Sequence, residues 1–198
     1  VPWSLSETVY RQTEGNPLFV QEVLRYLVEQ GHLARERETP PEMGLPEGLR
    51  DVIGKRLSGL SDQCNGVLSV AAVIGREFSL QVLQKVAGLT EEELYAALEE
   101  ASGVGVVEER SSVGGVVGFR FAHAFFRQTL YEETFAPRRI RLHQQVGRAL
   151  EEVYSARPEE HATEMAEHFA HSSDQEGLAK ALRYGEMAAG RAMSVYAY

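Results

Sequence analysis

Two short segments carry residues whose types and spacing could bind a nucleotide. The first consists of Gly15, Asn16, Pro17 and Leu18. Here a glycine and a good N-cap residue precede a proline at the first position of an expected helix. The flat ring of Pro17 could lie against a nucleotide base, because a proline ring demands no hydrogen bond. The alternative interpretation is a well-made helix start without a ligand.

The second segment surrounds His123, in the first turn of a helix expected from about Ala122 to Thr134. Free backbone N–H groups and the positive end of the helix dipole favour an anion at such a position. Arg127 follows four residues later, which places it on the same helical face. The three groups together predict a phosphate-binding site. The alternative is a histidine whose nitrogens are satisfied by neighbouring carbonyl groups.

Catalytic parts for ATP hydrolysis are not expected in this chain. The segment Gly48–Arg56 has five residues between its glycines where a phosphate-binding loop has four, and it offers Arg56 where a serine or threonine must reach magnesium. The segment Gly103–Val107 lacks the third glycine of a dinucleotide-binding fingerprint. We therefore predict no enzymatic activity for the chain alone.

Metal binding and thiol chemistry are not expected either. His161, Glu164 and His168 share a helical face, but the two histidines are about 10.5 Å apart along a helix, too far for one ion. His171 lies near that face. Cys64, the single cysteine, lies in an apolar helix and is interpreted as a core residue. The 138–141 basic run is interpreted as a solvated stripe, with an anion or partner contact as the alternative.

The composition limits the protein classes. Of the 198 residues, 43% are hydrophobic and 25% charged, which fits one to three small globular units. No apolar stretch of about 18 residues predicts a membrane span, and the cytoplasm is the expected compartment. The net charge of −9 argues against a general nucleic-acid-binding surface. Because Val1 is not an initiator methionine and the last residues, 194–198, stop inside an expected helix without a cap, we expect a longer parent protein.

Turn and capping signals predict a mainly helical fold. A short helix starting at Ser4 or Ser6 is followed by one that begins at Pro17 and ends before Gly31. Residues 36–46 are charged and proline-bearing, which is typical of a linker. Further helices are expected to begin at Pro46, Ser61, Ser79 and Thr90, the last with a capping box to Glu93.

Two strands, Val104–Glu109 and Val116–Phe121, are expected next, joined by a turn through Gly114-Gly115. Helices followed by a small β-hairpin are the order of a winged helix. Three further antiparallel helices are typical of the start of a tetratricopeptide-like (TPR-like) array. They are Arg138–Tyr154, a helix opened by Pro158 and carrying Phe169, and Leu178 to about Tyr196.

The expected winged helix does not carry the charge of a DNA reader. Its third helix, residues 91–102, contains five glutamates and neither lysine nor arginine. Carboxylates in a DNA groove are repelled by the phosphates. We therefore predict no direct DNA binding by this chain.

The segment Glu14–Leu27 resembles the lid-helix segment of the STAND class of AAA+-related signalling ATPases. That class includes large LuxR-type transcriptional regulators and ATPase modules attached to some bacterial adenylate cyclases. The segment Phe119–Arg127 resembles the end of the winged helix in that class, with His123 matching the histidine of a methionine-histidine-aspartate motif; Ala122 and Ala124 stand in place of the methionine and the aspartate. The segments Leu45–Ile53, Ala71–Phe78 and Pro137–Arg139 fit the same class.

The resemblance covers nearly the whole chain and implies its organisation. Residues 1–35 would form a helical lid segment, 36–46 a linker, 47–136 a winged-helix domain, and 137–198 the start of a TPR-like array. In that class the glycine-x-proline element contacts the adenine and the histidine contacts the β-phosphate of ADP.

The resemblance also implies a role and partners. The ligand would be ATP or ADP in the full-length parent, bound together with an upstream nucleotide-binding domain of the same protein. A protein partner or inducer would act through the helical array, and no membrane is involved. Two alternatives remain open: a protein–protein interaction module that senses no nucleotide, and a winged-helix transcription regulator.

Overall fold

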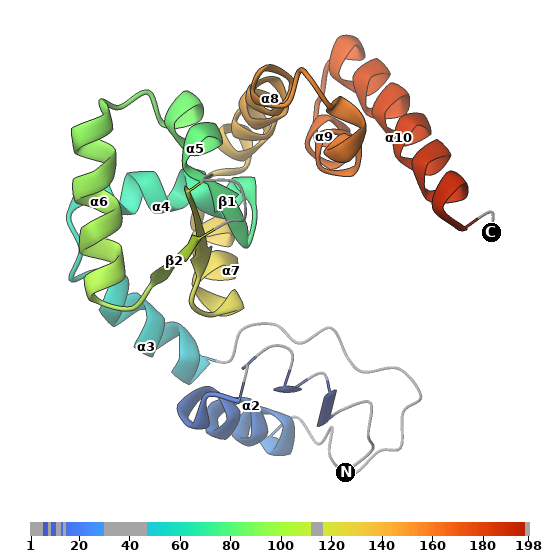
Figure 1. The fold of residues 1–198 in the computed structure, drawn as a ribbon. Helices are drawn as coiled ribbons and strands as arrows, with labels where there is room; N and C mark the ends of the chain where they lie inside the picture. Colours follow the sequence, from blue (N-terminus) through green and yellow to red (C-terminus); the bar gives the residue numbers. More distant parts are fainter. Residues whose placement is uncertain are drawn as a thin grey trace.

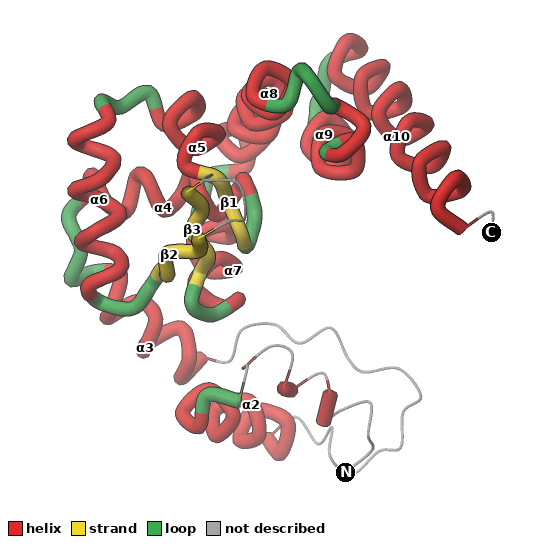
Figure 2. Tube along the Cα trace, in the orientation of Figure 1, coloured by secondary structure: helices red, strands yellow, loops and turns green. Residues whose placement is uncertain are grey.

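The computed structural model is mainly helical and contains one small antiparallel sheet (Figures 1 and 2). It describes residues 6–7, 9–10, 13, 15–29, 47–111 and 117–196. The predicted linker at 36–46 and the predicted turn at Gly114-Gly115 lie outside the described residues. So does the side chain of Leu18, although its backbone belongs to a helix.

Helix α2, Pro17–Glu29, begins at the proline that the sequence predicts. Gly15 precedes it with a φ of 76°, a conformation that glycine adopts without a steric penalty. The carbonyl of Asn16 accepts the Val20 N–H at 2.9 Å, so Asn16 occupies the position just before the helix. Figure 1 shows α2 beside α3, Glu47–Leu57, at one end of the molecule.

The middle of the chain contains α4 (Asp62–Ile74), α5 (Leu80–Ala87) and α6 (Glu91–Gly103). Each begins at a predicted hydroxyl cap. The Ser61 hydroxyl accepts the Cys64 N–H at 3.1 Å, and the Ser79 hydroxyl accepts the Val82 N–H at 3.2 Å. Thr90 and Glu93 form a complete capping box. The structure confirms these predicted helix starts. They could be predicted because a side-chain cap acts within a few residues of the helix start.

The sheet has three strands, β1 (Glu77–Ser79), β2 (Val107–Ser111) and β3 (Val117–Phe121), in the order β1-β3-β2. Both pairings are antiparallel. The β2–β3 hairpin is confirmed, but β2 begins three residues later than predicted. The reason is that α6 extends to Gly103 and a turn follows it, in which Gly105 has a φ of 70°. Strand β1 was not predicted.

The core is centred on α4, in which buried residues occur from Cys64 to Val73. Phe121 of β3 and Phe126 of the next helix are fully buried with it. Cys64 is also buried, and its thiol contacts the Ala97 carbonyl at 3.2 Å. Burial raises the pKa of this thiol to about 11, so Cys64 is a core residue, as the sequence predicts.

The last part of the chain contains α7 (Ala124–Glu133), α8 (Ala136–Val153), α9 (Ala162–Ala170) and α10 (Gln175–Tyr196). The helix predicted to open at Pro158 starts as a separate 3₁₀ turn, Pro158–Glu160, before α9. Figure 1 shows α9 and α10 side by side, on the side of the molecule opposite α6. Among the described helices, none combines the length and apolar character needed to cross a membrane.

Candidate functional site

The two predicted nucleotide-contact segments meet at one point. The amide nitrogen of Asn16 donates to Nε2 of His123 at 3.2 Å, although the two residues are 107 positions apart. Asn16 lies directly before α2, and His123 occupies the N-cap position of α7. The starts of two helices therefore lie together, and each start offers free backbone N–H groups.

The contact with Asn16 determines which His123 nitrogen carries the proton. An amide NH₂ group only donates, so Nε2 must accept and Nδ1 must bear the hydrogen in the neutral ring. That Nδ1 atom is buried and has no hydrogen-bond partner among the described residues. A buried N–H without an acceptor is costly, and a bound anion would satisfy it.

Phe19 of α2 holds the two segments together. Its ring meets the His123 ring edge-on, with centroids 4.7 Å apart, and it also packs edge-on against Phe125 and Phe126. Phe19 is only 2% exposed. Buried aromatic pairs of this geometry stabilise a contact beyond the effect of area alone. The neighbourhood of Asn16 and His123 is therefore a packed junction.

Positive charge gathers around His123. Burial is the main cause that lowers its pKa, and the charges of Arg56, Arg76 and Arg120 lower it further, while Glu108 opposes them. The guanidinium of Arg56 also lies 5.9 Å from the centroid of the Phe126 ring. His123 is therefore neutral near pH 7, and its Nδ1–H is a neutral donor within a cationic field.

Glu108 already supplies a carboxylate to this field. Arg120 donates to Glu108 at 2.7 Å, and this hydrogen bond is the main cause that lowers the pKa of Glu108. The charges of Arg120, His123 and Arg110 lower it further. An incoming phosphate would bring negative charge to the same arginine and would compete with Glu108.

Arg127 contacts α4 and Tyr131 in the structure. Its Nε donates to the Ala72 carbonyl at 3.0 Å, near the end of α4, and its guanidinium lies 5.6 Å from the centroid of the Tyr131 ring. His123 has extended backbone angles, φ −138° and ψ 145°, and the helix begins one residue later. The four-residue spacing of a helical face therefore does not apply between them.

The first predicted segment is only partly described. Gly15 and Pro17 are exposed, so the proline ring is accessible to a ligand. A methyl group on Gly15 would lie 3.4 Å from the ring of Tyr10, and the φ of 76° would strain any other residue there. Gly15, Asn16 and Pro17 thus form a turn that carries Asn16 to His123.

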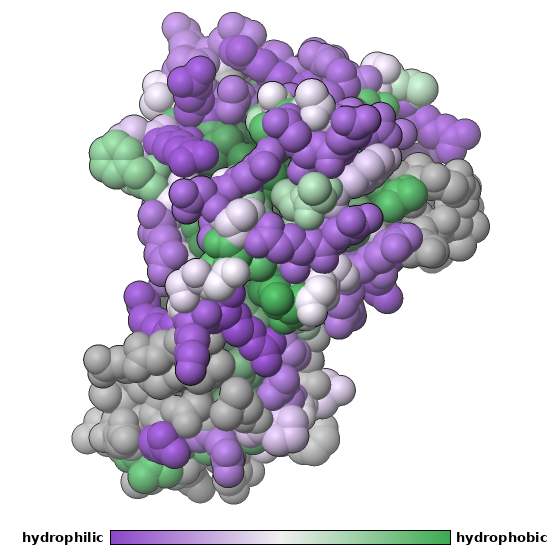
Figure 3. All heavy atoms as spheres, turned by 90° about the vertical axis from the view of Figure 1, so that its left-hand side faces the viewer, coloured by the Kyte–Doolittle hydropathy of each residue, from purple (hydrophilic) through white to green (hydrophobic). Residues whose placement is uncertain are grey.

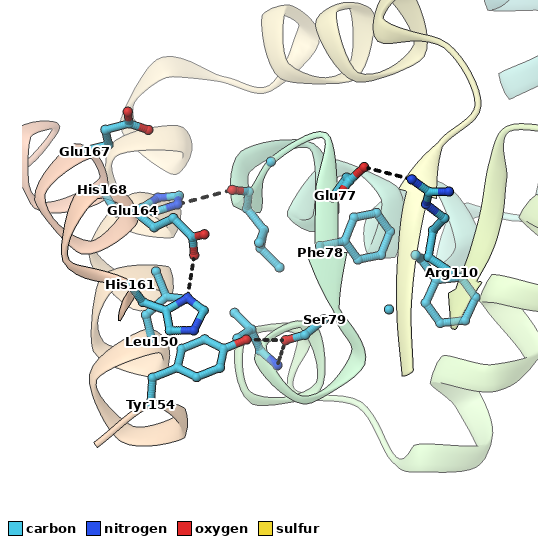
Figure 4. A pocket seen from close by; sticks show the side chains of 15 residues that line it. Glu77, Phe78, Ser79, Arg110, Leu150, Tyr154, His161, Glu164, Glu167 and His168 are labelled. Atoms are coloured by element: carbon cyan, nitrogen blue, oxygen red, sulfur yellow. Dashed lines mark hydrogen bonds and ion pairs between the residues drawn. The ribbon is translucent and has the colours of Figure 1, made fainter. Parts of the chain in front are cut away.

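Other candidate groups serve different contacts. His161 and Glu164 approach to 3.4 Å, whereas His168 bonds the Ile74 carbonyl at 3.2 Å. A cavity of about 410 Å³ lies between β1 and the α8–α9 pair, lined in part by Glu77, Tyr154 and these residues (Figure 4). Within the described part of the chain, no group of histidine, cysteine and carboxylate side chains could hold a metal ion.

The acidic helix is α6. Glu93 caps its own helix, and Glu100 accepts both the backbone N–H and the hydroxyl of Ser61, at 2.7 and 2.6 Å. Glu91, Glu92 and Glu99 are exposed. Figure 3 looks onto the side of the molecule that carries α6, and this face is mostly hydrophilic. Its exposed carboxylates repel a phosphate backbone.

Sequence reasoning missed the three arginines around His123. Arg120 lies three residues before His123 in β3, the middle strand, and pairs with Glu77 of β1. This pairing places the neighbouring Arg76 beside Phe121, whose N–H donates to the Arg76 carbonyl at 3.0 Å. Arg56 belongs to α3 and comes from farther along the chain. Only Arg120 gave a sequence signal, because its strand leads directly to His123. Comparison with protein-family models gives no match for this chain, and comparison with curated proteins gives none either.

Proposed function

We propose that this chain is the regulatory part of a STAND-type signalling ATPase, which senses bound ADP or ATP and transmits that state to a helical array. The observation that carries the proposal is the hydrogen bond between Asn16 and His123. It unites the two segments that the resemblance assigns to adenine and to phosphate. A packed junction with an unsatisfied donor and three nearby arginines suits a polyphosphate.

The arrangement of elements supports the proposed domains. In a winged helix, a short strand between the first two helices pairs with the hairpin that follows the third helix. The order α4, β1, α5, α6, β2, β3 and the β1–β3 pairing agree with that arrangement. Helices α9 and α10 lie side by side, and Phe169 of α9 stacks on Tyr184 of α10. This helix pair agrees with a TPR-like unit.

In this proposal the chain recognises nucleotide but does not hydrolyse it. A nucleotide-binding domain of the parent protein would supply the phosphate loop and the magnesium ligands. Pro17 would pack on the adenine, and His123 Nδ1–H would donate to the β-phosphate of ADP. ADP would then favour the closed arrangement in which α2 stays on α7, and ATP an open one. The cytoplasm is the compartment in which such a protein would act.

Equilibrium binding to the parent protein tests the proposal. Pro17→Ala should weaken ADP and ATP alike, because both share the adenine. His123→Ala should weaken the binding of ADP more than that of ATP, because ADP favours the closed arrangement in which His123 donates to the β-phosphate. A hydrogen bond to a charged group contributes about 1.5–3 kcal/mol. Equal affinities of His123→Ala and the unaltered protein for ADP would refute the assignment of His123.

The second candidate is a protein-interaction module. It is favoured by apolar side chains on α10, where Leu178, Leu182 and Met193 are exposed by 47%, 72% and 69%. Such side chains suit a protein contact. If Pro17→Ala and His123→Ala both bind ADP and ATP as the unaltered parent protein does, the result favours the interaction module over nucleotide sensing. Transcription control through α6 is the least supported, because its exposed carboxylates would repel DNA; salt-sensitive DNA binding at low salt would reverse that ranking.

A further inference from the structure

Four elements are joined by one chain of hydrogen bonds. The Tyr131 hydroxyl of α7 contacts Nε2 of His143 in α8 at 3.0 Å. Nδ1 of His143 contacts Nδ1 of His168 in α9 at 3.0 Å, and Nε2 of His168 contacts the Ile74 carbonyl of α4 at 3.2 Å. Figure 4 shows the last of these contacts. Both histidines are buried.

The Ile74 carbonyl at the end of this series of hydrogen bonds determines which nitrogen of each histidine carries the proton. A carbonyl oxygen only accepts, so Nε2 of His168 must donate to Ile74. In the neutral ring Nδ1 of His168 then accepts, and Nδ1 of His143 must donate to it. Nε2 of His143 is left to accept from the hydroxyl of Tyr131. All bonds can therefore form at once when both imidazoles are neutral and hold these tautomers. They can also form after one proton is added, either at Nε2 of His143, which then donates to Tyr131, or at Nδ1 of His168, which reverses the central bond.

The two histidines can hold one added proton without losing a hydrogen bond, but they cannot hold two. A proton added to Nδ1 of His168 makes Nδ1 of His143 an acceptor, and Tyr131 then accepts from His143. A second proton places two N–H groups against each other at the 3.0 Å contact. That contact cannot persist, because neither nitrogen retains a lone pair.

The charged surroundings oppose protonation. The titratable and charged groups facing the two histidines are Tyr131 and Arg127 from α7, Arg139 from α8, and His171 at the end of α9. Glu167 of α9 acts on Arg127 and so opposes part of that positive charge. Burial and the neighbouring positive charges lower the pKa of His143 to about 3. Burial is also the main cause that lowers the pKa of His168, to about 4.

We propose that Tyr131, His143 and His168 form a proton-sensitive latch that holds α8 and α9 against α4 and α7. Neutral, the latch is closed; two protons break its central bond and release α9. This inference does not depend on the proposed nucleotide sensing, since none of these residues contacts Asn16, Phe19 or His123 in the interactions described above. It assigns a mechanical role to the junction that joins α8 and α9 to the preceding elements.

The sign of the pH effect follows from the lowered pKa values. A released or unfolded histidine titrates near 6.5, whereas the latched ones titrate near 3 and 4. Below pH 6.5 the released state therefore binds more protons than the latched state. The contribution of the latch is fully present above that pH and is lost as the pH falls toward 4.

The tautomers provide the first test. In the ¹⁵N-labelled chain near neutral pH, two-bond ¹H–¹⁵N correlation spectra should show His168 protonated on Nε2 and His143 protonated on Nδ1. A free imidazole disfavours the Nδ1–H tautomer, so finding it in His143 is diagnostic of the hydrogen bonds to His168 and Tyr131. An Nε2–H tautomer for a neutral His143 would overturn the proposal, and this measurement needs no variant that must fold.

Amide hydrogen exchange provides the second test. After correction for intrinsic rates, lowering the pH from about 7 to about 5 should reduce protection in α9 by about tenfold or more, with α6 little affected. In His168→Gln, whose amide can still donate to Ile74 but cannot titrate, this pH effect should shrink severalfold. The matched control His161→Gln lies outside the latch and should behave as the unaltered chain. Equal pH dependence in both variants, or uniform loss in α6 and α9, would contradict the latch.

Discussion

Asn16 and His123 lie 107 positions apart in the sequence and share a hydrogen bond of 3.2 Å. This contact connects the start of α2 to the start of α7 and leaves Nδ1 of His123 as a buried donor without a partner among the described residues. A change at Asn16 is therefore felt at the His123 ring. Any ligand that accepts from Nδ1 would in turn act on the position of α2.

The first prediction concerns this contact. Asn16→Asp should raise the pKa of His123, because a carboxylate in place of the amide accepts from Nε2–H and favours the charged ring. At present burial and three arginines lower that pKa. An NMR titration of His123 measures the change. Gln21→Glu makes the same change of charge at an exposed position of α2 and should leave His123 nearly unaffected; equal shifts in both variants would show that the contact is not made.

The second prediction concerns the packing of α2. Phe19→Ala should reduce the free energy of unfolding by about 3–5 kcal/mol, the usual cost of removing a buried phenylalanine, since Phe19 is only 2% exposed and packs on Phe125. Phe135→Ala removes the same side chain where it is 73% exposed and should change stability by about 0.5 kcal/mol or less. Chemical denaturation of both variants tests this, and similar small losses would mean that α2 is not anchored.

The third prediction concerns the contact between α8 and α9. A Cβ at Gly147 would lie 2.8 Å from the ring of Phe169, which is buried and stacked on Tyr184. Gly147→Ala should therefore destabilise the chain by about 1–3 kcal/mol despite the better helix propensity of alanine. Gly185→Ala in α10 meets no atom within 4 Å and should stabilise by about 0.5–1 kcal/mol. Thermal unfolding compares the pair, and stabilisation by both substitutions would contradict the close packing.

The fourth prediction concerns Cys64. Its burial and a pKa raised to about 11 mean that little thiolate exists near neutral pH, so the native chain should resist alkylation by iodoacetamide. Denaturant should restore the rate of an ordinary cysteine. Mass spectrometry follows the labelling with time, and rapid native labelling would show that this part of the core opens readily.

Local chemistry was readable from the sequence. Pro17, Ser61 and the Thr90–Glu93 pair begin helices in the structure as expected, because caps and fixed proline angles act within a few residues. The strand expected at Val116–Phe121 likewise corresponds to β3, Val117–Phe121.

What was missed depends on distant contacts. Strand β1 has only three residues, too few for a periodic pattern, and it exists through pairing with β3. The meeting of Asn16 with His123 is set by the packing of Phe19, which no local signal encodes. The helical-face argument for Arg127 assumed that His123 is helical, whereas His123 is an extended cap residue.

The rate of ADP release from the parent protein tests the proposed sensing role most directly. Stopped-flow displacement of a fluorescent ADP analogue should show release about tenfold faster or more in His123→Ala, as expected for a lost hydrogen bond to a charged phosphate. His161→Ala, a matched change at a histidine that contacts Tyr154 and Glu164 instead, should release ADP at the unaltered rate. If His123→Ala also releases ADP at the unaltered rate, His123 serves only the junction with α2 and the proposed phosphate contact is wrong.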